Sequence, residues 1–188
     1  MKTTTSMKTN DSGLNVSVKE ITLIGMMIAI IEVCKVTMMG IPNVELTTFW
    51  VIMFTLYFQK RVLYVIPTFI LIEGMMFGFG TWWIMYLYTW PLLALITHLL
   101  RKKDSAWTWS VLSGIFGLAY GFLCSFPYFV MGFAEGGLRS GLISGFSWWV
   151  AGIPWDIVHG VANFILMLVL YRPIKHVMDS TKKFLPEM

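Results

Sequence analysis

Charged residues are scarce in this sequence. Asp, Glu, Lys and Arg make up 13% of its 188 residues, 57% are hydrophobic, and the mean hydropathy is +0.71. An average soluble domain has about 25% charged residues. Because the apolar excess runs along the whole chain, it excludes a soluble domain with a single anchor and predicts a membrane protein with several crossings.

Cysteines and catalytic motifs are also few. Cys34 and Cys124 each lie in an apolar stretch without a C-x-x-C pair, which favours two packed thiols over a disulfide or a metal site. Walker A, H-E-x-x-H and G-x-S-x-G sequences are missing. Basic residues are scattered, which argues against nucleic-acid binding. We therefore expect no catalytic residues, no metal and no cofactor, although an enzyme stays an open alternative.

Six apolar segments cover most of the chain, and most approach the roughly 20 residues needed to cross about 30 Å of hydrocarbon. The pattern predicts an all-α integral membrane protein, a six-transmembrane-helix bundle formed by one domain. The expected spans are 20–39, 44–58, 62–79, 82–100, 107–131 and 148–171.

Basic residues predict the orientation of the bundle. Of the 14 Lys and Arg, only Arg139 falls on one side and Lys35 lies inside the first span. The other twelve share a side with both termini, which the positive-inside rule assigns to the cytoplasm. They are Lys2, Lys8, Lys19, Lys60, Arg61, Arg101, Lys102, Lys103, Arg172, Lys175, Lys182 and Lys183. We expect a disordered cytoplasmic tail over 1–17, a six-helix substrate-binding domain over 18–175 and a second cytoplasmic tail over 176–188.

Ionisable residues within the spans gather in the outer half, where each is costly unless it pairs or meets water. Asp156, His159 and Asn163 also share one helix face, because they are three and four residues apart. Internal pairing is one explanation, with Lys35 neutralised by Glu32 or Glu73. An outward-facing polar cavity is the other, and the consistent preference for one half favours it.

Aromatic residues flank the same half. Tryptophan pairs open the fourth and sixth spans; an interfacial belt would explain them, but rings beside convergent polar groups also suit an organic ligand. The expected substrate-binding residues are Lys35, Asn43, Glu45, Glu73, Trp82, Trp83, Tyr86, Trp148, Trp149, Asp156 and His159. The glycine-rich connection 132–147 predicts a mobile lid, with a plain flexible linker as the alternative.

Three stretches resemble a known family. "IPNVEL", "GFGTWW" and "WWVAGIPWDIVHGVANFILMLVLYRPI" are similar to the substrate-binding S components of energy-coupling factor (ECF) transporters, which are ABC-type vitamin importers, and the resemblance covers about 20–175. It implies a multi-pass protein of a bacterial plasma membrane that captures a vitamin outside and topples to deliver it. A membrane coupling protein and two cytoplasmic ATPases would drive that step, so this chain itself would not be an enzyme.

The resemblance also suggests a coupling contact and a ligand. Family members meet the coupling protein through A-x-x-x-A on the first span, and here Gly25 and Ala29 form a G-x-x-x-A variant. Packing within the chain is the alternative use of these small residues. Cobalamin is the expected ligand, with a queuosine precursor, pyridoxine or pantothenate as smaller alternatives. A membrane enzyme using Asp156 and His159, and a stand-alone facilitator, are the rival functions.

Overall fold

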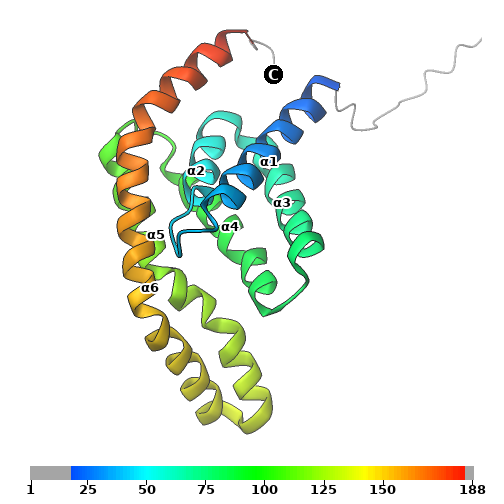
Figure 1. Cartoon of the computed structure of the whole chain (residues 1–188), viewed down its shortest axis with the longest axis vertical. Helices are drawn as coiled ribbons and strands as arrows, with labels where there is room; N and C mark the ends of the chain where they lie inside the picture. Colours follow the sequence, from blue (N-terminus) through cyan, green and yellow to red (C-terminus); the bar gives the residue numbers. More distant parts are fainter. Residues whose placement is uncertain (1–17, 185–188) are drawn as a thin grey trace, which may run out of the picture.

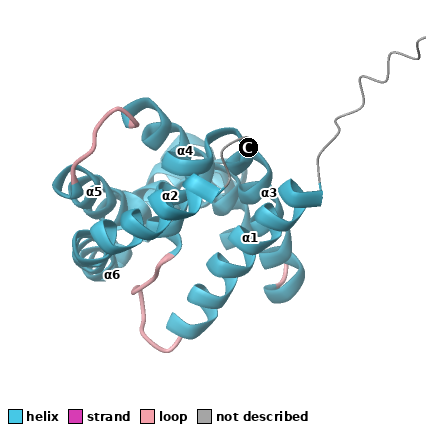
Figure 2. Cartoon of the chain, turned by 90° about the horizontal axis from the view of Figure 1, so that it is seen from above, coloured by secondary structure: helices cyan, strands magenta, loops and turns pink. Residues whose placement is uncertain are grey.

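Every regular element is a helix in the computed structural model, which describes residues 18–184 (Figure 2). This confirms the all-α prediction. The expected tail over 1–17 lies outside the described residues, as do residues 185–188. The elements are α1 (Val18–Met38), α2 (Thr47–Phe58), the short 3-10 helix η1 (Gln59–Arg61), α3 (Val62–Phe77), α4 (Thr81–Leu100), α5 (Ala106–Cys124) and α6 (Phe126–Phe184).

Four helical stretches among the described residues are long and apolar enough to cross a membrane. They are Val18–Met38, Thr47–Phe77, Thr81–Leu100 and Ala106–Thr181. The second joins α2, η1 and α3, and the fourth joins α5 and α6. With 12 residues, α2 is only about 18 Å long and does not reach across the hydrocarbon by itself.

The short helix α2 is the centre of the bundle. It contacts α1, α3, α4, α5 and α6, and it lies between the α5–α6 pair and α1 with α3 (Figures 1 and 2). Most of its side chains are buried, with Phe49, Ile52 and Phe54 at 2% exposure or less, while Trp50 and the last turn are partly buried. An apolar helix is stable when neighbours cover its apolar surface. Thr47 and Thr48, in the first turn of α2, are buried as well.

Basic side chains collect at one end of the bundle, which we call the basic end (η1, connection 101–105 and residues 172–181). Arg61 Nη2 lies 3.0 Å from Glu20 Oε1, and Lys175 pairs with Asp104. The Lys175 ammonium, and then the Tyr171 hydroxyl 3.0 Å away, donate to Asp104 and hold the pKa of its carboxyl below the ordinary value. These contacts tie η1 to α1 and connection 101–105 to α6.

Two connections lie at the opposite end, which we call the cavity end (connections 39–46 and 78–80) (Figure 1). Connection 39–46 folds back toward the helices through Pro42 and through Asn43, whose φ of 56° lies in the left-handed region that Asn tolerates. The connection therefore returns over the bundle and forms one wall of the cavity described below.

The last two helices form a long hairpin. Within α6 only Gly136 and Gly137 leave helical backbone angles, and Gly137 has φ 71°. The chain reverses there, so residues 126–135 run antiparallel to the start of the following helix and project past connection 78–80 (Figure 1). From 138 to 184 the helix is about 70 Å long, more than twice the hydrocarbon thickness.

Connection 132–147, expected to be a mobile lid or a flexible linker, is helical on both sides of that reversal. Its glycines allow close helix packing. A Cβ on Gly141 would lie 2.8 Å from the Phe129 carbonyl oxygen, and one on Gly132 would lie 2.8 Å from Ser144 Cβ. Only Gly137 needs a conformation that other residues rarely adopt. The glycine content predicted flexibility here. In the structure, the absence of side chains at these glycines lets the two arms of the hairpin pack closely.

Small residues also bring α5 and α6 together nearer the bundle. A Cβ on Gly117 would lie 2.8 Å from the Cα of Gly160, and one on Gly114 would lie 3.3 Å from the Gly160 carbonyl oxygen. Such close backbone approach is what small residues permit between membrane helices. The crossing lies one turn from Asp156 and next to His159, and it places both residues against α5.

Candidate functional site

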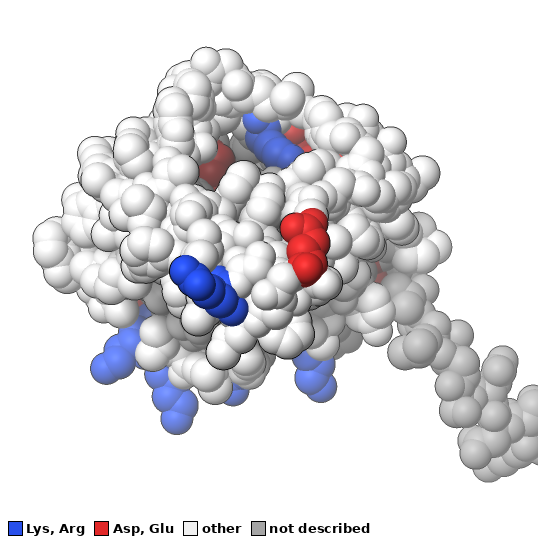
Figure 3. Space-filling view, turned by 90° about the horizontal axis from the view of Figure 1, so that it is seen from below, with Lys and Arg blue, Asp and Glu red and all other residues white. Residues whose placement is uncertain are grey.

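A polar cavity of about 250 Å³ opens at the cavity end. Connection 39–46 covers one side, and α1, α4, α5 and α6 contribute the others. The surface at the cavity end has a hollow, and charged side chains of both signs lie in this hollow (Figure 3). The lining residues are Lys35, Met38, Met39, Ile41, Pro42, Asn43, Val44, Glu45, Thr47, Tyr86, Trp90, Tyr120, Asp156 and His159.

Glu45 links the α1–α2 connection to α6. Its carboxylate accepts from the Thr48 backbone N–H at 3.1 Å and from the Thr48 hydroxyl at 2.5 Å, which satisfies donors at the start of α2. His159 Nε2 lies 3.2 Å from Glu45 Oε1, and Asn163 Nδ2 donates to Thr48 Oγ1 at 3.2 Å. Two members of the polar stripe on α6 therefore hold the start of α2 in place.

Asp156, the third member of the stripe, faces α5. Its Oδ1 accepts from the Gly121 backbone N–H at 2.9 Å, and its side chain is 7% exposed. A Cβ on Gly121 would lie 2.7 Å from Asp156 Cγ, so the carboxyl occupies space that the glycine leaves open. Its Oδ2 has no hydrogen-bond partner among the described residues. Asp156 and His159 thus have separate partners.

Lys35 pairs with Glu73 on α3, which is fully buried. The Lys35 ammonium also lies 5.2 Å from the ring centres of Phe77 and Tyr86, within cation–π range. Of the two pairings that the sequence left open, the structure forms the one across helices. Both carboxylate oxygens of Glu32 are buried without a hydrogen-bond partner in the described part of the chain.

Three aromatic rings line the interior side of the cavity. The rings of Tyr86 and Trp90 are 5.4 Å apart and edge to face, and Trp90 lies 5.8 Å from Tyr120. Tyr120 in turn meets His159 edge to face at 5.0 Å. The three rings come from α4 and α5, and the contact of Tyr120 with His159 continues this aromatic wall to α6. A flat ring and a nitrogen-bearing group both suit such a wall.

The structure brings some of the predicted site residues together and separates others. Those that line the cavity are Lys35, Asn43, Glu45, Tyr86, Asp156 and His159. Glu73 and Trp82 lie behind them around Lys35, whose ammonium is 5.8 Å from the Trp82 ring.

The remaining predicted tryptophans have other contacts. Trp83 donates from Nε1 to the Ile70 carbonyl at 2.8 Å, and so joins α4 to α3. Trp148 stacks on Tyr128 at 3.8 Å, and Trp149 packs edge to face against Phe122 at 5.3 Å. Trp148 and Trp149 thus hold the hairpin together, away from the cavity lining.

Sequence reasoning did not include all of the polar and aromatic lining residues. Thr47, Trp90 and Tyr120 line the cavity and were not among the expected substrate-binding residues. Tyr120 precedes Gly121 and follows the glycines that let α6 approach, so the glycine spacing on α5 was the available evidence. For Thr47 no local pattern was available, because its place depends on how connection 39–46 folds back.

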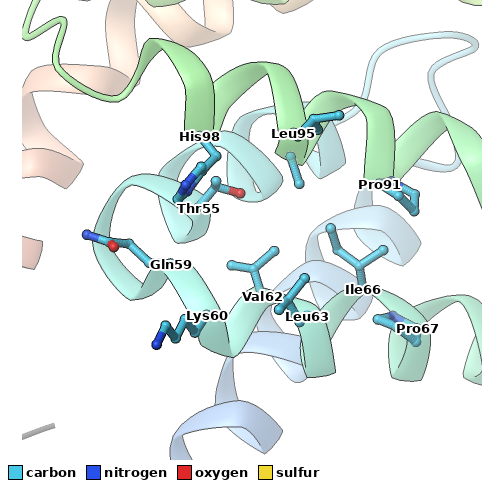
Figure 4. A pocket seen from close by; sticks show the side chains of 11 residues that line it. Thr55, Gln59, Lys60, Val62, Leu63, Ile66, Pro67, Pro91, Leu95 and His98 are labelled. Carbon is cyan, nitrogen blue, oxygen red and sulfur yellow. The ribbon is translucent and has the colours of Figure 1, made fainter.

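A second, larger pocket of about 470 Å³ lies nearer the basic end, between α2, α3 and α4 (Figure 4). Its lining is mainly apolar, with Ile66, Pro67, Pro91 and Leu95 along its length and Lys60 near one end. Its lining contains no carboxylate, and it contains none of the residues Glu45, Thr48, His159 and Asn163, which form the polar contacts described above. We therefore take the smaller polar cavity as the candidate binding site.

The small residues of the expected coupling motif face outward. Gly25 has no other atom within 4 Å of the position a Cβ would take, and Ala29 is exposed one turn further along α1. Packing within the chain, the alternative use of this motif, is therefore not observed among residues 18–184. The motif leaves a small-residue patch open on the side of the bundle.

These observations define a class: an all-helical protein with helices long and apolar enough to span a membrane, built around a polar, aromatic-lined cavity. Among residues 18–184, no three His, Cys, Asp or Glu side chains come together as a metal site requires. No protein-family model, no curated protein and no solved structure matches the chain.

Proposed function

We propose that this chain is the substrate-capture subunit of an importer, an S component of the ECF type. The observation that carries the proposal is the polar cavity: Lys35, Glu45, Asp156 and His159, which are distant in sequence, meet around one small volume between apolar helices. Ionisable groups within membrane helices generally mark substrate or ion pathways. The absence of a nucleotide motif from the sequence agrees with ATP hydrolysis by partner subunits.

The proposal includes six crossings of a bacterial plasma membrane with both termini in the cytoplasm. In this proposal α1, α3 and α4 each cross once, and the short α2 crosses together with connection 39–46. The two arms of the α5–α6 hairpin supply the other two crossings. The segregation of Lys60, Arg61, Lys102 and Lys175 at the basic end supports a cytoplasmic position for that end. The cavity then opens to the outside, where a scavenged nutrient first meets the protein.

The cavity volume favours a small ligand. Pockets for drug-sized molecules measure roughly 300–1,000 Å³, and this one measures about 250 Å³. Cobalamin is larger than drug-sized molecules and would need a larger cavity than this one. The smaller alternatives suggested by the resemblance, a queuosine precursor, pyridoxine or pantothenate, are closer to this volume.

The coupling surface proposed for this subunit is the patch around Gly25 and Ala29. The test is purification of the tagged full chain from its native membrane. We expect one membrane protein and two ATPases to accompany the chain, together with a small molecule identifiable by mass spectrometry. Ala29→Trp should lose the three proteins and keep the small molecule, because a bulky ring prevents close helix approach at the patch.

Ala134→Trp is the matched control, since Ala134 is equally exposed but lies at the tip of the hairpin. This variant should keep both the partners and the small molecule. The proposal fails if no ATPase accompanies the wild-type chain, or if solute flux occurs in liposomes that contain this chain alone. It also fails in its coupling surface if both tryptophan variants behave alike.

A further inference from the structure

The acidic and basic groups around the cavity are unequal in number. Four carboxyl groups, those of Glu32, Glu45, Glu73 and Asp156, lie on or directly behind its wall, against one lysine and one histidine. Lys35 pairs with Glu73, and His159 pairs with Glu45. Among the described residues, no basic side chain forms an ion pair with Asp156. A buried carboxylate without a charged partner is costly unless a bound group supplies the opposite charge.

The buried polar atoms without a hydrogen-bond partner are also mainly carboxyl oxygens. Among the described side chains near the cavity, the buried oxygens without a partner are Glu32 Oε1 and Oε2, Glu73 Oε1 and Asp156 Oδ2, whereas Trp90 Nε1 is the unpartnered nitrogen. Ionised carboxylate oxygens only accept hydrogen bonds. The site therefore lacks donors, and a ligand with N–H groups would supply them.

Asp156 is the carboxylate best placed to meet such a ligand. It lines the cavity, and only 7% of the residue's surface is exposed. The Gly121 N–H donates to Oδ1, and the buried Oδ2 has no hydrogen-bond partner among the described residues. Because the carboxylate is already held in place, less conformational entropy is lost when it binds a ligand.

The aromatic wall points to the same chemistry. Tyr86, Trp90 and Tyr120 line the cavity together with Asp156. A cation beside the faces of Tyr and Trp rings is attracted by the ring quadrupole, and pockets with several aromatic rings are a common way to recognise ammonium groups. The same rings provide flat apolar surface for the ring of the ligand.

We propose that the ligand is a small ring compound with a protonated, N–H-bearing nitrogen, which Asp156 binds beside the Tyr86–Trp90–Tyr120 wall. This inference rests on the proposed function only for its physiological meaning, because the binding itself requires no partner. It selects amines and protonated heterocycles over carboxylates of the same size.

The test compares ring compounds that differ mainly in charge. One series is benzylammonium, benzyl alcohol and benzoate. A second series of larger molecules is protonated tryptamine, indole-3-ethanol and indole-3-acetate. Binding to the purified full chain in lipid nanodiscs is measured at pH 7 by calorimetry and by the shift of the thermal midpoint. We expect the cation of at least one series to bind tenfold or more tightly than its alcohol and its anion.

Asp156→Asn should weaken binding of that cation at least tenfold and leave binding of the alcohol unchanged, since it removes the charge and keeps the size. Glu135→Gln is the control, because it makes the same chemical change at the exposed tip of the hairpin. Circular dichroism verifies that both variants are folded. If Asp156→Asn is unfolded, Tyr120→Leu and Trp90→Leu provide the comparison, and each should weaken the cation more than the alcohol.

The inference is overturned if the anion binds as tightly as the cation, if neither series binds, or if the folded Asp156→Asn chain binds the cation as the wild type does. These outcomes are separate from failure of the proposed function. Cation binding by a chain that brings no ATPase from the membrane would refute the importer role and retain this site. If the ATPases and the membrane protein accompany the chain but the chain prefers anions, the importer role is retained and the cation site is refuted.

Discussion

At the scale of single residues, one hydroxyl group connects two parts of the site. Thr48 donates to Glu45 at 2.5 Å and accepts from Asn163 at 3.2 Å, and it is completely buried. Glu45 in turn meets His159. The position of connection 39–46 over the cavity therefore depends on a polar chain that runs from α6 to the start of α2. Loss of any member leaves a buried polar group without its partner.

Thr48→Val removes that hydroxyl at nearly constant volume. We expect a loss of about 1–3 kcal/mol in the free energy of unfolding, because the Asn163 amide is left unpaired in the interior. Thr55→Val is the control: its hydroxyl is also buried but donates only to the Val51 carbonyl of its own helix, at 2.6 Å. Reversible unfolding in mixed micelles measures both, and equal effects would contradict a special role for Thr48.

At the scale of elements, the α5–α6 crossing depends on missing side chains. Gly117 meets the backbone of Gly160, whereas Gly25 on α1 faces open space. Both glycines are inside helices, where Ala is intrinsically preferred by about 1 kcal/mol. The same substitution at the two positions therefore separates helix propensity from packing.

Gly117→Ala should destabilise the chain by more than about 1 kcal/mol, since the added Cβ displaces backbone that cannot easily move. Gly25→Ala should leave stability unchanged or raise it. Thermal unfolding followed by circular dichroism compares the two variants. A Gly117→Ala protein as stable as Gly25→Ala would show that the helices do not cross as closely as described.

The connection between α4 and α5 is tied to α6 by Asp104. Its carboxyl has a lowered pKa because Lys175 and Tyr171 donate to it, so its stabilising effect is present above the ordinary value of 3.8 and is lost as the pH falls through the lower folded value. Asp104→Asn should therefore cost under about 1 kcal/mol at pH 7, as is usual for exposed pairs. The difference from wild type should shrink below pH 3.8, and a difference that grew in acid would refute the assignment.

At the scale of the whole molecule, the two ends differ in charge and in shape. The basic end carries the connections with Lys and Arg, and the cavity end carries the hollow and the projecting hairpin (Figures 1 and 3). A helix of about 70 Å also extends beyond any single bilayer crossing. Our proposal places the hairpin tip outside the cell and the charged end of α6 inside.

Cysteine labelling in whole cells tests this arrangement. In a chain with Cys34 and Cys124 replaced by alanine, Leu138→Cys should react with a membrane-impermeant maleimide from outside. Lys102→Cys should react only after permeabilisation, because it belongs to the basic end. The reverse pattern would invert the proposed orientation, and labelling of both from outside would refute the six-crossing topology.

Much of the helical framework followed from local patterns. The expected boundaries of the first four spans differ from α1, α2, α3 and α4 by three residues or fewer, because an apolar run and its polar flanks are adjacent in the sequence. The hairpin was the exception, because the glycines at 132, 141 and 145 pack against the opposite arm. Amino-acid composition does not show which residues of the other arm a glycine will contact.

The sequence by itself determined that the chain is helical and apolar, where its basic residues gather, and that Asp156, His159 and Asn163 share a face. Only the tertiary structure decided their partners: Gly121 for Asp156, Glu45 for His159 and Thr48 for Asn163. Helix formation depends on residues three or four positions apart, so it can be deduced locally. The polar cavity depends on contacts between segments more than 100 residues apart, which only the packed bundle brings together.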